Sequence, residues 1–193
     1  MATVSPTLTR NRYFLSSLAV LGALLAAWWL FSPGAPAVPT TEPGAVGVVT
    51  GGFAERGKPA PGFALATLDG GRQSLQGLSG RPVLINFWAT WCPPCRAEIP
   101  HLVSAYEMYG DEGLEILAVD LQSDVGPDAV RAFAQEFGMT FPILLDSTGS
   151  VERAYLVRGY PTSIFIGRDG VIERIHWGPM TGGQVEEFIG EIL

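Results

Sequence analysis

Two cysteines are the residues of this chain whose spacing points most directly to chemistry. Cys92 and Cys95 are the only cysteines among the 193 residues, and they lie three positions apart. A structural disulfide framework would need more cysteines spread along the chain, so the pair indicates a redox-active dithiol or half of a metal site. Pro93 and Pro94 lie between them. At the start of a helix both prolines are tolerated, because first-turn N–H groups make no intrahelical bond, and they stiffen the turn.

The pair lies where a strand is expected to give way to a helix. Residues 83–88 form a nearly continuous apolar run typical of a central strand, and residues 93–109 carry a helical pattern. Unpaired N–H groups at a helix N-terminus stabilise a thiolate, and comparable thiols have pKa values lowered from ~8.5 to between about 3.5 and 7.5. Cys92 is therefore the candidate nucleophile. Cys95, one turn deeper and expected to be less exposed, is the candidate resolving thiol.

The elements that must position this pair follow an alternating pattern from about residue 57 onward. Short apolar runs predict strands, amphipathic stretches predict helices, and turn residues such as Asp69-Gly70-Gly71 separate them. Alternating strands and helices, with a hairpin near the C-terminal end, predict an α/β three-layer sandwich with a mixed central sheet. The other expected strands are 63–67, 72–75, 115–121, 143–145, 162–166 and 171–176, and the other expected helices are 127–137 and 184–193.

The first 56 residues predict export and anchoring. Residues 13–31 carry no charge, follow two arginines, and as a helix would cover roughly 28 Å, close to the ~30 Å hydrocarbon core of a bilayer. We interpret them as a transmembrane anchor with residues 1–12 in the cytoplasm, whereas a cleaved signal peptide is the alternative. Residues 32–56, with four prolines and five glycines, predict a flexible linker to a domain at 57–193.

Charge and histidine content narrow the possible partners. The chain has 12 basic and 19 acidic residues, and 10 basic and 19 acidic residues remain from residue 42 onward, for a charge of −9. A surface this negative repels phosphate backbones and argues against nucleic acid as a partner. His101 and His176 could complete a zinc site with the two cysteines, but His176 has no ligand spacing to another donor. We therefore predict no metal and no cofactor.

The residues around the cysteine pair resemble a known family. Segment 86–95 reads Asn-Phe-Trp-Ala-Thr-Trp-Cys-Pro-Pro-Cys, Pro100 follows it, and Tyr160-Pro161-Thr162 precedes a late strand. This pattern is similar to the thioredoxin superfamily and, more narrowly, to its membrane-anchored TlpA/ResA/CcmG (DsbE) group. The resemblance covers roughly residues 57 to 193. It implies a thioredoxin-like fold with an N-terminal hairpin extension and a strand-helix insertion, which residues 115–145 match.

The resemblance also implies a set of supporting residues. Trp91 would support the active site beside Cys92, and Asn86 occupies the position where cytoplasmic thioredoxins carry a buried aspartate. In the anchored group a glutamate three residues after the second cysteine is the proton carrier, and Glu98 matches it. On a helix Cys92, Cys95 and Glu98 lie within roughly 120° of one another. The alternative for Glu98 is a solvated helix residue.

A second implied set binds the substrate. Pro161 would follow a cis peptide bond facing the disulfide, which overturns the base rate that only about 5–6% of X–Pro bonds are cis. The backbone of Tyr160 would then pair with an extended substrate segment. Pro100 is expected only to kink its helix.

For function, the resemblance implies an extracytoplasmic, membrane-anchored, monomeric thiol-disulfide oxidoreductase. It would reduce disulfides in exported proteins, notably apocytochrome c, with electrons from a membrane thiol carrier of the CcdA/DsbD type. A peroxiredoxin-type peroxidase is disfavoured because Ile85 and Ala89 stand where its proline and Thr/Ser would be, and a papain-like enzyme lacks a partner motif. A membrane-tethered peptide-binding adaptor or chaperone is the non-catalytic alternative.

Overall fold

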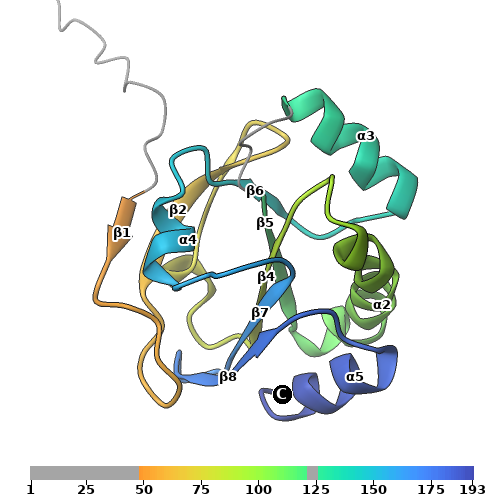
Figure 1. Cartoon of the computed structure of the whole chain (residues 1–193). Helices are drawn as coiled ribbons and strands as arrows, with labels where there is room; N and C mark the ends of the chain where they lie inside the picture. Colours follow the sequence, from red (N-terminus) through yellow and green to blue (C-terminus); the bar gives the residue numbers. More distant parts are fainter. Residues whose placement is uncertain (1–47, 121–125) are drawn as a thin grey trace, which may run out of the picture. The chain divides into compact units, whose positions relative to one another are not determined.

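The computed structural model describes residues 48–120 and 126–193 (Figure 1). The predictions for residues 1–12 and 13–31, and for the linker up to residue 47, lie outside the described residues. Within the two described ranges, no helix combines the length and the apolar character needed to cross a membrane.

A mixed β-sheet forms the centre of the domain. Its strands run in the order β1-β2-β6-β5-β4-β7-β8, with β3 paired to β2. The pairs β4–β5 and β5–β6 are parallel, and every other pair of this sheet is antiparallel. The strands are β1 (Val48–Thr50), β2 (Gly62–Thr67), β3 (Arg72–Ser74), β4 (Val83–Trp88), β5 (Glu115–Asp120), β6 (Ile143–Leu145), β7 (Thr162–Ile166) and β8 (Ile172–Trp177).

Helices cover both faces of this sheet (Figure 1). All six residues of β4 are buried. Because side chains alternate along a strand, they pack into two separate hydrophobic cores, one on each face of the sheet. Leu84 and Trp88 pack with α2, α3 and α5, whereas Ile85 and Phe87 pack with α4. The helices are α2 (Pro93–Tyr109), α3 (Pro127–Phe137), α4 (Ser150–Ala154) and α5 (Gly182–Gly190), with 3-10 turns at Gln76–Leu78 and Gly110–Glu112.

Most expected elements are confirmed, and the differences have local causes. The observed bounds equal the predicted ones at 83–88, 93–109, 127–137, 143–145 and 162–166. The structure adds α4, a five-residue helix too short to show a periodic pattern. It forms because Asp146 accepts hydrogen bonds from the backbone N–H groups of Ser150, Val151 and Glu152. The structure also adds β1, which lies inside the segment predicted as a linker.

The last strand and the last helix differ slightly from their predicted bounds. The predicted strand 171–176 is observed as β8 (Ile172–Trp177), and the predicted helix 184–193 as α5 (Gly182–Gly190). Helix α5 begins earlier in the chain than predicted because Thr181 and Gln184 form a capping box. In this box each side chain accepts a hydrogen bond from the other residue's backbone N–H.

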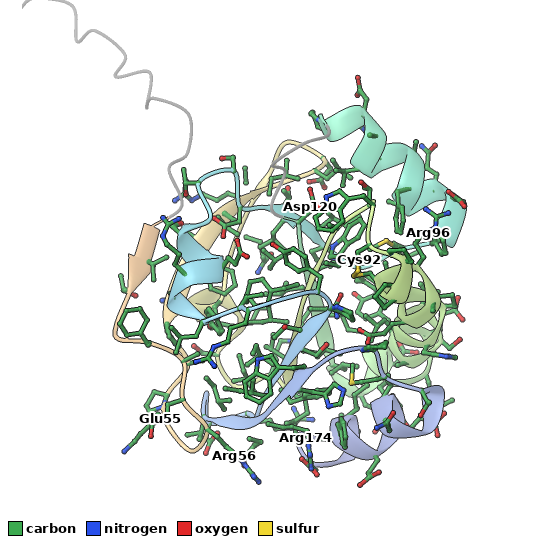
Figure 2. All side chains as sticks on the ribbon, in the orientation of Figure 1. Glu55, Arg56, Cys92, Arg96, Asp120 and Arg174 are labelled. Carbon is green, nitrogen blue, oxygen red and sulfur yellow. A yellow bond between two sulfur atoms is a disulfide. The ribbon has the colours of Figure 1, made fainter. Side chains whose placement is uncertain are left out.

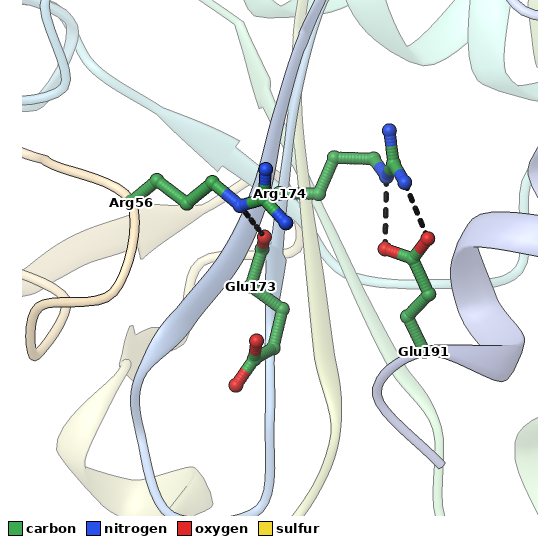
Figure 3. Close-up of polar contacts among 4 residues, drawn as sticks. All are labelled: Arg56, Glu173, Arg174 and Glu191. Carbon is green, nitrogen blue, oxygen red and sulfur yellow. Dashed lines mark hydrogen bonds and ion pairs between the residues drawn. The ribbon is translucent and has the colours of Figure 1, made fainter.

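Strand β8 forms an edge of the sheet, and the chain before β2 protects part of that edge. Gly57 N–H donates to the Ile172 carbonyl at 2.8 Å. The Arg56 Nε donates to the Glu173 carbonyl at 2.7 Å, as Figure 3 shows. Arg174 forms a two-point ion pair with Glu191 at the end of α5. The edge strand is thereby tied both to the N-terminal segment and to the last helix.

Candidate active site

The two cysteines form a disulfide at the N-terminus of α2. Their sulfur atoms are 2.06 Å apart and their Cα atoms 5.3 Å apart. Cys92 is the residue immediately before the helix, and the Cys95 N–H donates to the Cys92 Sγ at 3.2 Å. Both residues are almost fully buried, with 3% of Cys92 and 1% of Cys95 exposed. A thiolate on Cys92 would therefore lie against a backbone donor at the positive end of the helix dipole.

Glu98 lies one turn after Cys95 on the same helix and is buried, so the alternative of a solvated residue is wrong. Only 1% of it is exposed. Its Oε1 accepts a hydrogen bond from the Asn86 Nδ2 at 2.8 Å, and its Oε2 accepts one from the Met180 backbone N–H at 2.7 Å. Burial raises the pKa of Glu98 to about 7, although these two hydrogen bonds act in the opposite direction. The carboxyl group can thus gain or lose a proton near neutral pH.

Asn86 connects this carboxyl group to the sheet. Its amide donates to Glu98 and also to the Ser163 Oγ at 2.9 Å, because Asn86 on β4 lies directly opposite Ser163 on β7. Sequence reasoning missed Ser163 and Met180 as members of this network. A serine within the apolar run of β7 was the available signal for Ser163, whereas a backbone N–H such as that of Met180 carries no sequence signal.

The cis-proline region lies beside the motif tryptophan. The Tyr160–Pro161 peptide bond is cis, as the resemblance implies. The Tyr160 ring meets the Trp91 indole edge to face, with centroids 5.8 Å apart, and Trp91 is 55% exposed. Beyond Tyr160 lies an open hollow of about 410 Å³ lined by Arg158, Gly159, Tyr160, Pro161, Trp177 and Gly178.

The inserted helix α3 packs against the first turn of the active-site helix. Arg96, which follows Cys95, extends over the rings of Phe133 and Phe137 at 5.0 and 4.8 Å and pairs with Glu136 at 2.7 Å. Figure 2 shows Arg96 at this junction, close to the labelled Cys92. Phe133 also packs on Trp88, with ring centroids 4.7 Å apart. The strand before the cysteines and the helix after them are therefore both braced by α3.

The zinc alternative finds no support in the structure. Across residues 48–120 and 126–193, no group of three or more His, Cys, Asp or Glu side chains is placed to hold a metal ion. His176 instead packs its ring 5.5 Å from that of Phe188.

Comparison with known proteins identifies relatives of this chain. Residues 56–175 match the model of the AhpC/TSA family. The chain is 43% identical to the thioredoxin-like protein YneN of Bacillus subtilis, over 69% of this chain and 78% of YneN. It is 40% identical to the thiol-disulfide oxidoreductase ResA of Halalkalibacterium halodurans, over 71% of this chain and 77% of ResA.

Two solved structures show the same fold. A thiol:disulfide interchange protein of the thioredoxin family from Chlorobium tepidum is 29% identical with a TM-score of 0.62, covering 72% of this chain and 97% of the other. StoA from Bacillus subtilis is 32% identical with a TM-score of 0.59, covering 68% of this chain and 98% of StoA.

Proposed function

The chain belongs to the AhpC/TSA family and is a thiol-disulfide oxidoreductase of the ResA type, and from this premise we propose that Cys92 and Cys95 carry its exchange reaction. The observation that carries the proposal is the disulfide at the N-terminus of α2, in which the Cys95 N–H is directed at the Cys92 sulfur. That arrangement stabilises negative charge on Cys92 selectively, because Cys92 alone occupies the position before the helix.

The reaction starts from the reduced pair. The Cys92 thiolate attacks one sulfur of the substrate disulfide, a mixed disulfide forms, and the other substrate sulfur leaves as a thiolate that takes a proton. The Cys95 thiolate then attacks the Cys92 sulfur and releases the second substrate thiol. Two electrons pass to the substrate, and Cys92 and Cys95 end as the disulfide seen in the structure.

Glu98 serves as the proton carrier for Cys95. Cys95 must lose a proton before it attacks and regain one when the pair is reduced again. A carboxyl group whose pKa is near 7 can do both at neutral pH, and Glu98 reaches that value because it is buried one turn below Cys95.

In the cell the protein acts as a reductant of exported proteins, with apocytochrome c as a substrate. A membrane thiol carrier of the CcdA/DsbD type supplies its electrons, and the catalytic domain lies on the extracytoplasmic side as a monomer anchored by residues 13–31. The support for this assignment is the resemblance around segment 86–95 together with the uncharged segment 13–31 behind two arginines.

Two cysteine variants test the assigned roles in the full-length protein, purified in mild detergent. Cys92→Ser is expected to abolish reduction of a protein disulfide, because it removes the attacking thiolate. Cys95→Ser is expected to accumulate a mixed disulfide between Cys92 and the substrate, which mass spectrometry detects. Normal turnover by Cys92→Ser, or no covalent adduct on Cys95→Ser after exposure to an oxidised protein, would refute the assignment.

Topology has a separate test. A reporter fused after Leu193 is expected to be active only if it is a type that works outside the cytoplasm, and N-terminal sequencing of the mature protein is expected to find residues 13–31 retained. A mature N-terminus near Val38 would replace the anchor by a cleaved signal peptide, and a reporter active only in the cytoplasm would refute export.

A further inference from the structure

The Tyr160 side chain makes a hydrogen bond to which the exchange mechanism described above assigns no role. Its hydroxyl donates to the Glu152 Oε1 at 2.8 Å. Burial, followed by the Glu152 carboxylate, raises the pKa of Tyr160, so the phenol remains a donor at physiological pH. The ring is partly buried and meets the Trp91 indole on its way to the surface. The side chain is therefore fixed at its hydroxyl and along its ring.

Hydrogen bonds hold the Glu152 backbone at both its N–H and its carbonyl. It belongs to α4, whose first N–H groups, including that of Glu152, are bound by the fully buried Asp146 carboxylate. The Glu152 carbonyl accepts a hydrogen bond from the Val157 N–H at 3.1 Å, which closes the C-terminal end of α4. The bond from Tyr160 to Glu152 thus ties the residue before the cis peptide bond to a fixed point on the scaffold.

Tyr160 adjoins two features of the surface that a polypeptide could contact. The Tyr160 ring meets Trp91, which adjoins Cys92 and is 55% exposed, and Tyr160 also lines the hollow together with Trp177, which is 59% exposed. Exposed large aromatic side chains beside an open hollow are typical of a recognition surface. A small disulfide can react through contact with the cysteine sulfur alone. A protein disulfide also places several neighbouring residues of its own chain against this surface.

We propose that Glu152 is a positioning residue for protein substrates, which fixes the Tyr160 side chain against the Trp91 indole and in the wall of the hollow that Trp177 also lines. The proposal rests on the function proposed above. Without this hydrogen bond the Tyr160 ring can adopt other rotamers. Binding of a protein segment then carries the additional entropic cost of ordering the ring. The substrate class that depends on Glu152 is the disulfide within a polypeptide. A small disulfide such as glutathione disulfide reaches Cys92 without filling that hollow.

The test compares two substrates in single-turnover experiments with the pre-reduced full-length protein. Insulin supplies a protein disulfide and glutathione disulfide a small one. Glu152→Ala is expected to lower the second-order rate constant for insulin about three- to tenfold relative to that for glutathione disulfide, the effect of losing one hydrogen bond. The loss is expected in the half-saturating insulin concentration, whereas the maximal rate stays within about twofold.

Three further variants separate positioning from general damage. Glu152→Gln keeps an oxygen acceptor and is expected to restore the preference for insulin. Tyr160→Phe removes the hydroxyl and is expected to match Glu152→Ala, and the double variant is expected to be no worse than either single one, because all three lack the same bond. Glu107→Ala, at an exposed glutamate on α2, is the matched control and is expected to resemble the parent.

The outcomes distinguish this proposal from the proposed function. A parent protein that reduces neither substrate refutes the exchange reaction itself. A parent that reduces both, with the same ratio of rate constants in Glu152→Ala, refutes the positioning role. Additive losses in the double variant would refute the link between Glu152 and Tyr160.

Discussion

At the scale of single residues, Glu98 shows how opposing effects set a chemically useful pKa. Burial favours the neutral acid, whereas the N–H donors of Asn86 and Met180 favour the carboxylate. Burial is the larger effect, and the pKa settles at about 7. A carboxyl group with this pKa one turn after Cys95 should titrate together with the reduced cysteines, so the apparent values belong to the whole set of groups.

Glu98→Gln is the direct test of that coupling. Below pH 7 the parent Glu98 is mostly neutral, and above pH 7 its negative charge opposes thiolate formation at the cysteines. The variant lacks this charge at every pH, so its thiols are expected to have lower pKa values and its rate of disulfide exchange a weaker dependence on pH. The measurements are thiolate absorbance during a pH titration and the pH-rate profile. Glu107→Gln on the same helix is the control. Curves for Glu98→Gln that overlay those of the parent would contradict the role of Glu98 and would mean that water carries the proton.

The raised pKa of Glu98 also predicts how stability changes with pH. The unfolded chain releases this proton near the ordinary value of 4.5, whereas the folded chain holds it until about 7. Between these values the folded state binds more protons, so Glu98 makes stability fall as pH rises, and the fall ends above about pH 7. Urea unfolding of the oxidised protein at pH 5 and pH 8 is expected to show a loss on the order of 2–3 kcal/mol that Glu98→Gln lacks. Equal pH dependence in both proteins would contradict the raised pKa.

At the scale of elements, the end of α4 carries a backbone conformation that its residue does not favour. Leu156 has a φ of 54°, in the left-handed region, just after the helix. The bonds from Leu156 N–H to the Arg153 carbonyl and from Val157 N–H to the Glu152 carbonyl form a Schellman motif, in which glycine is the usual residue at this position. Helix α3 ends with a glycine there, since Gly138 has a φ of 67°.

Leu156→Gly is therefore expected to stabilise the protein. A non-glycine residue in the left-handed region costs about 1–2 kcal/mol, and part of the gain is offset because glycine loses more backbone entropy on folding. We expect the free energy of unfolding to rise by about 0.5–1 kcal/mol in urea denaturation. In the reciprocal variant Gly138→Ala, the added Cβ has no neighbouring atom within 4 Å. The free energy of unfolding should therefore fall by about 1 kcal/mol through backbone strain alone. Destabilisation by Leu156→Gly would show that the leucine side chain packs more strongly than its 43% exposure indicates.

At the scale of the whole molecule, the domain begins before the predicted boundary at residue 57. Strand β1 pairs with β2 through Val48–Thr50, and Ala54 is buried in the core shared with α4. The Ala54 N–H donates to the Ala154 carbonyl at 2.9 Å, and Arg56 bonds to β8. The segment 48–56 thus joins the β1 edge of the sheet to α4 and to the β8 edge.

Truncation measures what this segment contributes. A fragment 57–193 is expected to unfold at lower urea concentration than a fragment 48–193, with a loss on the order of 1–3 kcal/mol from the missing strand pairing and the uncovered β8 edge. Both fragments should retain the Cys92–Cys95 disulfide, because those residues and the elements that hold them lie outside the deleted segment. Equal stability of the two fragments would mean that residues 48–56 behave only as a linker.

The cysteine pair, its strand-to-helix setting and most element boundaries could be predicted from the sequence. These features depend on residues close together in the chain: the period of apolar residues along 83–88 and 93–109, and the prolines at the first turn of α2. Local patterns of this kind can be read without knowing which segments meet. The fold class followed from the order of the elements, since alternating strands and helices allow few sheet arrangements.

The surroundings of those residues could not be predicted without the three-dimensional fold. Glu98 could be placed on the cysteine side of its helix from spacing, but its burial depends on Asn86, 12 residues before it, and on Met180, 82 residues after it. The bond between Tyr160 and Glu152 and the pairing of β1 with β2 have no periodic signal either. The reason is physical: a side chain's pKa and its hydrogen-bond partners depend on segments that folding brings together, whereas periodicity records only which face of one element is apolar.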